Sequence, residues 1–238
     1  RWGMASAQAG AGSEAERRSG EARSAGKTGD RVLDWPLELG LEVSWVAAGD
    51  GTRLRVLTGG AACGPRVVFV HGFPQNAAEW RRVVRHLSDR FRVVLYDLRE
   101  YGASELGRSG HYDLDTLASD LEAVVETTSG EGAPGLGPIV CAHDWGGPIT
   151  WHALGRAPSL ARGHVAVNAP HMAAYARDLA STRTQLARAW YTAVFQIPGV
   201  EHMLSAKGAS FIASMFRHSS PPGLFSDEEL ELYLASMR

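Results

Sequence analysis

The residues of this sequence best suited to chemistry gather in the stretch Cys-Ala-His-Asp-Trp-Gly-Gly, residues 141–147. Its carboxylate, Asp144, stands among small residues directly after the apolar run 138–142. A sharp turn from a strand into a helix accepts only small neighbours and holds its central side chain exposed at the sheet edge. The following helix also points the positive end of its dipole at that position. Asp144 is therefore a candidate nucleophile, and the alternative is that it only caps a helix beginning near Pro148.

Apolar runs alternate with amphipathic segments along the middle of the chain, where they would form the elements that position this turn. A hairpin is expected at 43–58, around the turn Asp50-Gly51. Apolar residues recur every three or four positions at 78–89 and 113–130, which predicts two helices. Buried parallel strands are expected at 66–72, 92–98, 138–144 and 164–170. This alternation favours an α/β, doubly wound fold: a mostly parallel sheet with helices on both faces.

The two ends of the chain differ in character from this core, which we place at 31–168. Residues 1–30 are rich in Ala, Gly, Ser and charge, with little to bury, so we expect a disordered tail. Residues 169–238 contain several helical stretches and no convincing strand. We interpret them as a mostly helical, incomplete insertion that lies over the sheet as a cap.

Composition narrows the classes of function. The formal net charge is −2 over 238 residues, and without a cluster of Lys or Arg we expect no nucleic-acid partner. No apolar stretch reaches the 18 residues of a membrane span, and the N-terminus lacks the apolar core of a secretory signal. We therefore expect a cytoplasmic location and no membrane association. The nine histidines and two cysteines show no metal-binding spacing, so no metal is expected. The oligomeric state stays open.

Three further motifs accompany the stretch around Asp144. His-Gly-Phe-Pro-Gln follows the first predicted parallel strand, and Asp-Leu-Arg-Glu-Tyr-Gly-Ala-Ser follows the second. Trp-Tyr, then Phe-Gln-Ile-Pro-Gly, lies in the helical part; these three motifs occupy residues 71–75, 97–104 and 190–199. In this order and spacing the four motifs resemble the α/β-hydrolase superfamily, in its epoxide hydrolase branch, which also includes haloalkane and fluoroacetate dehalogenases. The resemblance covers residues 31–238.

The resemblance implies a fold and a set of roles. The fold is the α/β-hydrolase fold with an inserted helical cap. Asp144 would be the nucleophile and Tyr191 the donor that protonates the epoxide oxygen, although Tyr191 could instead be an aromatic packed into the cap. The backbone amides of Phe73 and Trp145 would form an oxyanion hole. The loop beside the substrate would contain His71, Gly72 and Pro74, although a Gly-Pro turn of this kind is also common without function. No cofactor is implied, and the partner would be a small-molecule electrophile.

The chemistry explains an Asp in place of a Ser. A carboxylate with a reference pKa of about 3.9 is ionised at neutral pH, so it needs no base in order to attack. It can displace a carbon–oxygen or carbon–halogen bond at an sp³ carbon and leave an ester on the enzyme. A histidine-activated water then attacks the ester carbonyl, while a tyrosine O–H supplies the proton that the departing alkoxide requires.

Two departures from the family pattern stand out. Glu100 occupies a position where the family usually has Gly, and a positive φ there would strain the loop. No histidine after Asp144 follows a final sheet strand: His152, His164, His171, His202 and His218 fall in the predicted elbow helix, the next strand or the cap. We therefore expect a truncated chain, without the final strands, the base with its orienting acid, and the second tyrosine.

Three functions stay open at this point. The first is epoxide opening through a covalent Asp144 ester, with turnover limited by the missing histidine. The second is a haloalkane or fluoroacetate dehalogenase that uses the same nucleophile, with the Trp145 indole holding the halide. Phe73 favours the first, because haloalkane dehalogenases typically have Asn at that position. The third is an inactive fragment or a ligand-binding pseudoenzyme.

Overall fold

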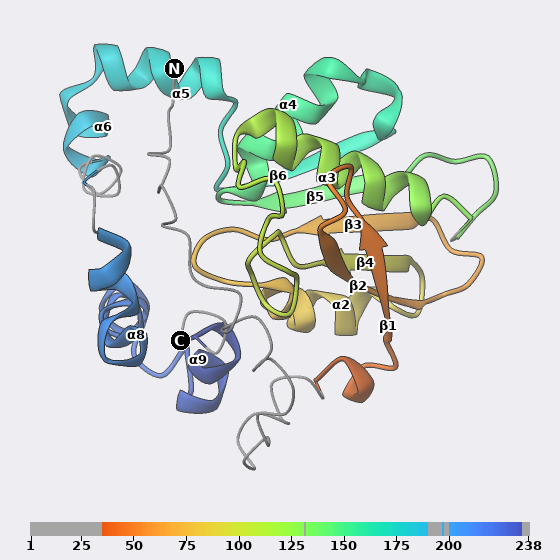
Figure 1. Ribbon diagram of the computed structural model, residues 1–238, viewed down its shortest axis with the longest axis horizontal. Helices are drawn as coiled ribbons and strands as arrows, with labels where there is room; N and C mark the ends of the chain where they lie inside the picture. The colour runs from red at the N-terminus through yellow and green to blue at the C-terminus, as the bar shows by residue number, and fades with distance from the viewer. Residues whose placement is uncertain (1–34, 131, 190–196, 198–199, 235–238) are drawn as a thin grey trace, which may run out of the picture.

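The computed structural model describes residues 35–130, 132–189, 197 and 200–234. Within them, six strands form one sheet in the order β1-β2-β4-β3-β5-β6 (Figure 1). Their bounds are β1 (Glu42–Ala47), β2 (Arg53–Gly60), β3 (Arg66–Val70), β4 (Arg92–Tyr96), β5 (Ile139–His143) and β6 (Gly163–Val167).

Strand pairing confirms the predicted mixture of a hairpin and a parallel sheet. β1 and β2 pair antiparallel around Asp50-Gly51, where Gly51 has a φ of 79° and the Thr52 N–H donates to the Asp50 carboxylate (3.0 Å). β4, β3, β5 and β6 run parallel to one another. Every residue of β3 is buried, as expected for a central strand covered on both faces. The carboxyl ends of β3, β4 and β5 therefore meet at one edge of the sheet.

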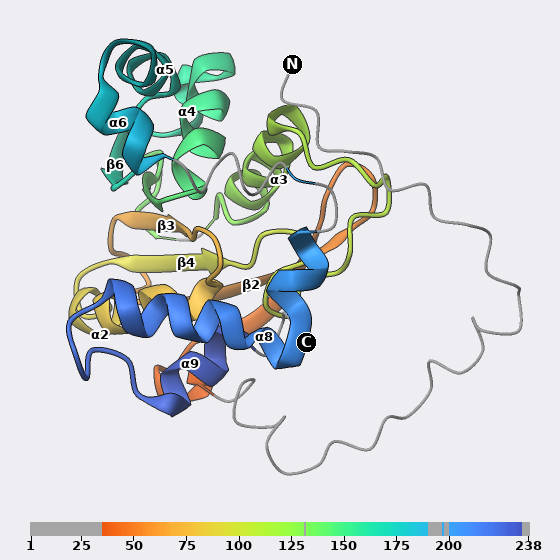
Figure 2. The same ribbon diagram turned by 90° about the vertical axis from the view of Figure 1, so that its left-hand side faces the viewer.

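Helices cover both faces of the sheet, and Figure 2 shows α8 and α9 on the same side as α2. One hydrophobic cluster joins the sheet to α3 and α4, and the other joins it to η2, α2, α8 and α9. The bounds are η2 (Ala77–Trp80), α2 (Arg81–Leu87), α3 (Leu114–Thr127), α4 (Gly146–Arg156), η3 (Pro158–Leu160), α5 (Met172–Ser181), α6 (Arg183–Arg188), α8 (Val200–Ser219) and α9 (Asp227–Leu234). None of these described helices is long and apolar enough to cross a membrane.

The observed helices differ in detail from those predicted from the sequence. The segment predicted as one helix at 78–89 is a 3₁₀ turn followed by α2, because the Asn76 side chain accepts the Ala78 N–H and starts the turn early. The described part of 169–238 is helical from α5 onward. Apolar side chains of α8 and α9, such as Ile212 and Tyr233, are buried in the cluster on the α2 side of the sheet. The tail predicted at 1–30 lies outside the described residues.

A buried ion pair fixes α3 to the end of β4. Arg99 and Asp120 are 2% and 1% exposed, and the guanidinium donates to both carboxylate oxygens at 2.7 Å. Asp50 adds a third carboxylate contact to Arg99 at 3.2 Å. The next residue, Glu100, has a φ of 69°, so this loop holds a non-glycine residue in the left-handed region at a cost of about 1–2 kcal/mol.

Removing one partner of this ion pair leaves a buried, poorly compensated charge. We expect Asp120→Ala to lower the free energy of unfolding by about 3–5 kcal/mol in denaturant titrations followed by circular dichroism. Asp115→Ala, in the same helix, is the matched control: its 77% exposed side chain pairs with Arg156 at the surface, so its loss should cost less than about 1 kcal/mol. Equal losses in the two variants would contradict this assignment.

Candidate active site

The turn between β5 and α4 places Asp144 at the carboxyl edge of the sheet. Asp144 has a φ of 47°, in the left-handed region that non-glycine residues seldom adopt, and α4 begins two residues later at Gly146. The N-cap of α4 is Trp145, so Asp144 does not serve as the helix cap. Trp145 is partly buried and packs against the cluster on the α3–α4 side.

Three glycines permit the close approach of backbone segments around Asp144. A Cβ on Gly72 would lie 2.5 Å from the Asp144 Cβ, and one on Gly146 would lie 2.6 Å from the Val70 carbonyl oxygen. A Cβ on Gly147 would lie 2.1 Å from the Cβ of Ala169, in the loop after β6. The end of β3 and the turn after β5 can therefore touch only because Gly72 and Gly146 carry no side chain, and Gly147 does the same for the contact with the loop after β6.

This contact brings a backbone donor onto the carboxylate. The Phe73 N–H donates to Asp144 Oδ1 at 3.0 Å. The Gln75 N–H closes the loop by donating to the Gly72 carbonyl at 3.0 Å, and Pro74 between them is buried. Two backbone amides are predicted to form an oxyanion hole. That of Phe73 donates to the Asp144 carboxylate, and that of Trp145 belongs to the residue directly after Asp144.

His71 holds the start of this loop as a buried, neutral histidine. Its Nε2 accepts the Leu98 N–H at 2.9 Å, so the ring proton is on Nδ1, which donates to the Gly72 carbonyl at 3.0 Å. Burial lowers the pKa of His71, which favours this neutral form. His71 thus ties the loop after β3 to the end of β4.

Asp97, directly after β4, binds the segments that surround this loop. Its fully buried carboxylate accepts the Arg55 Nε–H at 2.6 Å and the Ala77 N–H at 2.8 Å. It also accepts the Ala103 N–H at 3.0 Å, and Gly102 lies so close that a Cβ there would be 2.1 Å from a carboxylate oxygen. Through Asp97, the motif 97–104 therefore connects β2, the start of η2 and the loop after β4 close to the site.

One pair of residues beside Asp144 has no counterpart among the sequence predictions. His143 Nδ1 lies 2.9 Å from Glu79 Oε1, and the Gly72 N–H donates to Glu79 Oε2 at 3.3 Å. The sequence offers only one signal for it, a carboxylate in the first turn after the loop 71–75.

This pair changes the titration of His143. The carboxylate of Glu79, 2.9 Å from Nδ1, raises the pKa of His143 above 6.5; the negative charge of Asp144 raises it further, and burial opposes both. The stability that this pair contributes is thus fully present below about pH 6.5. It is lost as the pH rises through the higher pKa of the folded state.

The predicted site is therefore assembled in part. Asp144, Phe73, Gly72 and His71 come together at the sheet edge, whereas Tyr191 lies outside the described residues. In the part of the chain that the structure describes, no cluster of three or more His, Cys, Asp or Glu could hold a metal ion.

The tight packing at Gly147 gives a direct test of the turn. We expect Gly147→Ala to lower the free energy of unfolding by about 1–3 kcal/mol, because the added methyl group overlaps Ala169. Gly155→Ala in the same helix meets no atom within 4 Å and should raise it by roughly 0.5–1 kcal/mol. Adding Ala169→Gly to Gly147→Ala should recover part of the loss. Destabilisation of the same size at both glycines would show that close approach is not the cause.

Comparison with known proteins agrees with this geometry. A family model described as "alpha/beta hydrolase fold" matches residues 65–219. The chain is similar to epoxide hydrolase 3 of Mus musculus, 32% identical over 77% of this chain and 50% of the relative. It is also similar to epoxide hydrolase 1 of Caenorhabditis elegans, 28% identical over 76% of this chain and 45% of the relative.

A solved structure gives the same result at the level of the fold. The epoxide hydrolase of Bacillus megaterium, solved in complex with an inhibitor, superposes with a TM-score of 0.70 at 25% identity. That match covers 81% of this chain and 66% of the other. The chain thus spans about half the length of the two curated relatives and two thirds of the solved one. The chain belongs to the alpha/beta hydrolase fold family, and the relatives it resembles within that family include epoxide hydrolases.

Proposed function

We propose that this protein is a hydrolase that opens epoxides to diols through an ester on Asp144. The observation that carries the proposal is the hydrogen bond from the Phe73 amide to Asp144 Oδ1, at a turn where Asp144 has a φ of 47°. An Asp in this position points to attack on an sp³ carbon, because its carboxylate attacks without a base. The names of the relatives support an epoxide as the electrophile.

In the first step the two carboxylate oxygens have different tasks. Oδ1 is held by the Phe73 amide, so Oδ2 is the oxygen that attacks an epoxide carbon. The carbon–oxygen bond of the ring breaks, and its electron pair passes to the departing oxygen. Tyr191 donates a proton to that alkoxide. The products of this step are a hydroxyalkyl ester on Asp144 and a tyrosinate.

In the second step water attacks the ester carbon of Asp144. Oδ1 is then the carbonyl oxygen, and it acquires the negative charge of the tetrahedral intermediate. The Phe73 amide already lies on this oxygen, and the Trp145 amide is the second donor of the oxyanion hole. Collapse of the intermediate breaks the bond between the Asp144 carbonyl carbon and the alkyl oxygen, and the diol leaves.

The second step also needs a base for the water. Of the two described histidines next to Asp144, His71 has both ring nitrogens in hydrogen bonds and has none free to accept a proton from water. His143 has Glu79 against its Nδ1, and no described contact places its Nε2 beside the Asp144 carboxylate. The described residues thus support formation of the ester more strongly than its hydrolysis.

Labelling with heavy oxygen tests the nucleophile. We expect a single turnover of styrene oxide in H₂¹⁸O to place ¹⁸O in the Asp144 peptide rather than in the diol, because water attacks the ester and not the epoxide. If hydrolysis is blocked, the same peptide should instead carry a persistent adduct of the epoxide. Asp144→Asn should lower both signals by at least about a thousandfold.

The remaining outcomes distinguish the other functions. Direct ¹⁸O incorporation into the diol, without label on Asp144, would overturn the ester mechanism. Halide release from a haloalkane, with no reaction of styrene oxide, would indicate a dehalogenase that uses the same carboxylate. Intact, folded protein with neither adduct nor product would indicate an inactive fragment or a ligand-binding pseudoenzyme.

A further inference from the structure

Glu79 contacts both segments that form the candidate site. One carboxylate oxygen lies 2.9 Å from Nδ1 of His143, the residue before the nucleophile. The other oxygen accepts the N–H of Gly72, the residue before the oxyanion donor Phe73, at 3.3 Å. The Glu79 side chain therefore bridges the end of β5 and the loop after β3.

A carboxylate is well matched to this bridge. It has two oxygens: one accepts the backbone N–H of Gly72, and the other lies at ion-pair distance from His143 Nδ1, where its negative charge favours the protonated imidazole. The Glu79 side chain is only 10% exposed and that of His143 is 25% exposed, so the pair is shielded from much of the screening that weakens surface ion pairs. A rise in the pKa of His143 follows from this contact.

We propose that Glu79 is a positioning residue that holds the Gly72–Phe73 backbone against the Asp144 turn. Through this hold, Glu79 keeps the Phe73 amide on the carboxylate oxygen that becomes the oxyanion. The structural part of the proposal is independent of the reaction, and its effect on rates rests on the proposed function.

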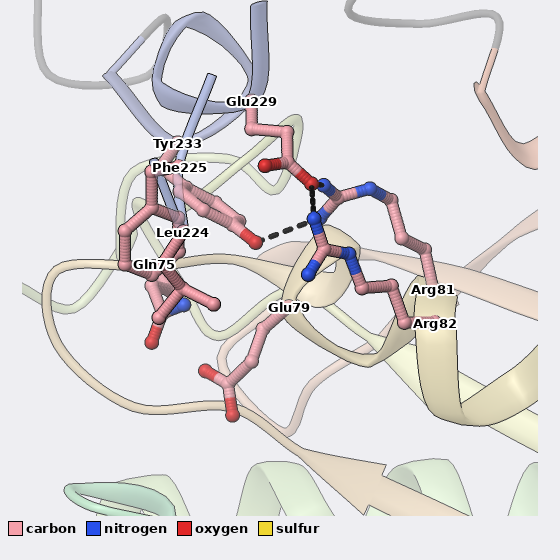
Figure 3. A pocket seen from close by; sticks show the side chains of 8 residues that line it. All are labelled: Gln75, Glu79, Arg81, Arg82, Leu224, Phe225, Glu229 and Tyr233. Atoms are coloured by element: carbon pink, nitrogen blue, oxygen red, sulfur yellow. Dashed lines mark hydrogen bonds and ion pairs between the residues drawn. The ribbon is translucent and has the colours of Figure 1, made fainter. Parts of the chain in front are cut away.

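A pocket of about 210 Å³ beside η2 provides a control residue for Glu79. It is lined by both Glu79 and Glu229, with Gln75, Arg81, Arg82, Leu224, Phe225 and Tyr233. Figure 3 shows Glu229 facing Arg81 and Arg82, whereas Glu79 extends away from these arginines. The ion pairs of Glu229 join α9 to α2, so the two carboxylates share a pocket and differ in what they hold.

The two chemical steps should depend on Glu79 to different degrees. During attack on the epoxide, charge leaves Asp144 and the Phe73 amide is needed less. During ester hydrolysis, full negative charge develops on Oδ1, where the Phe73 amide is needed most. Misplacing that amide therefore slows ester hydrolysis more than ester formation.

Amide hydrogen exchange tests the structural part without any substrate. We expect Glu79→Ala to increase the exchange rates of the Gly72 and Phe73 amides at least about tenfold. Glu79→Gln should give a smaller increase, because its carbonyl can still accept from Gly72 but cannot pair as an anion with His143. Glu229→Ala should leave both rates unchanged, and protected β3 amides report that each variant is folded. If Glu79→Ala fails to fold, Glu79→Gln alone decides the question. Unchanged Phe73 exchange in every folded Glu79 variant would overturn the proposal.

Quenched-flow mass measurements on styrene oxide test the effect on rates. In Glu79→Gln we expect loss of the Asp144 ester to slow about tenfold and its formation to slow less than twofold. Equal slowing of both steps would indicate general loosening and contradict a positioning role in ester hydrolysis. If the unsubstituted protein forms no ester at all, the proposed function fails; if it forms an ester that persists, the claim that Glu79 speeds ester hydrolysis in this chain is overturned. In both cases the exchange data still decide whether Glu79 places the Phe73 amide.

Discussion

The site depends on how closely two backbone segments approach at the carboxyl edge of the sheet. β3 and β5 are parallel neighbours, so the loop after one and the turn after the other emerge side by side. They can touch only where no side chain stands between them, and the residues at the contact are Gly72 on one side and Gly146 on the other. The hydrogen bond from Phe73 to Asp144 follows from this approach. A methyl group at either glycine would push the two segments apart and so separate the Phe73 N–H from the Asp144 carboxylate.

Buried polar groups keep this approach in place from below. Asp97 gathers Arg55 and two backbone amides at the end of β4, and His71 ties the same strand end to the loop after β3. Each of these groups would be costly to bury alone, and each is satisfied by partners on a different element. The network therefore specifies one arrangement of three strand ends, on which the placement of Asp144 relies.

Much of the architecture could be predicted because its signals are local. Runs such as residues 67–70 are apolar over consecutive residues, as a strand buried on both faces requires, and the stretch around Asp144 has the small residues that a tight turn requires. The departure at Glu100 was also visible, because the family favours Gly there and the observed φ is 69°. The contacts of Glu79 with His143 and Gly72 could not be predicted. The contact with His143 joins residues 64 positions apart, the contact with Gly72 depends on how the loop after β3 folds back, and a glutamate and a histidine also occur on ordinary surfaces. Tyr191 stays a prediction, since it lies outside the described residues.

The neighbourhood of Glu79 has a consequence for the charge of acceptable substrates. If His143 is protonated, its positive charge cancels the negative charge of Glu79, and the side chains of Asp144, Glu79 and His143 together carry a charge of −1. An uncharged electrophile such as an epoxide enters this field without a Coulombic cost. An anionic electrophile such as a haloacetate is repelled by it, and the repulsion grows as the surroundings lose water. Glu79 contributes to this repulsion only by offsetting the positive charge of His143, which would otherwise attract an anion; the net charge of −1 is that of Asp144 itself.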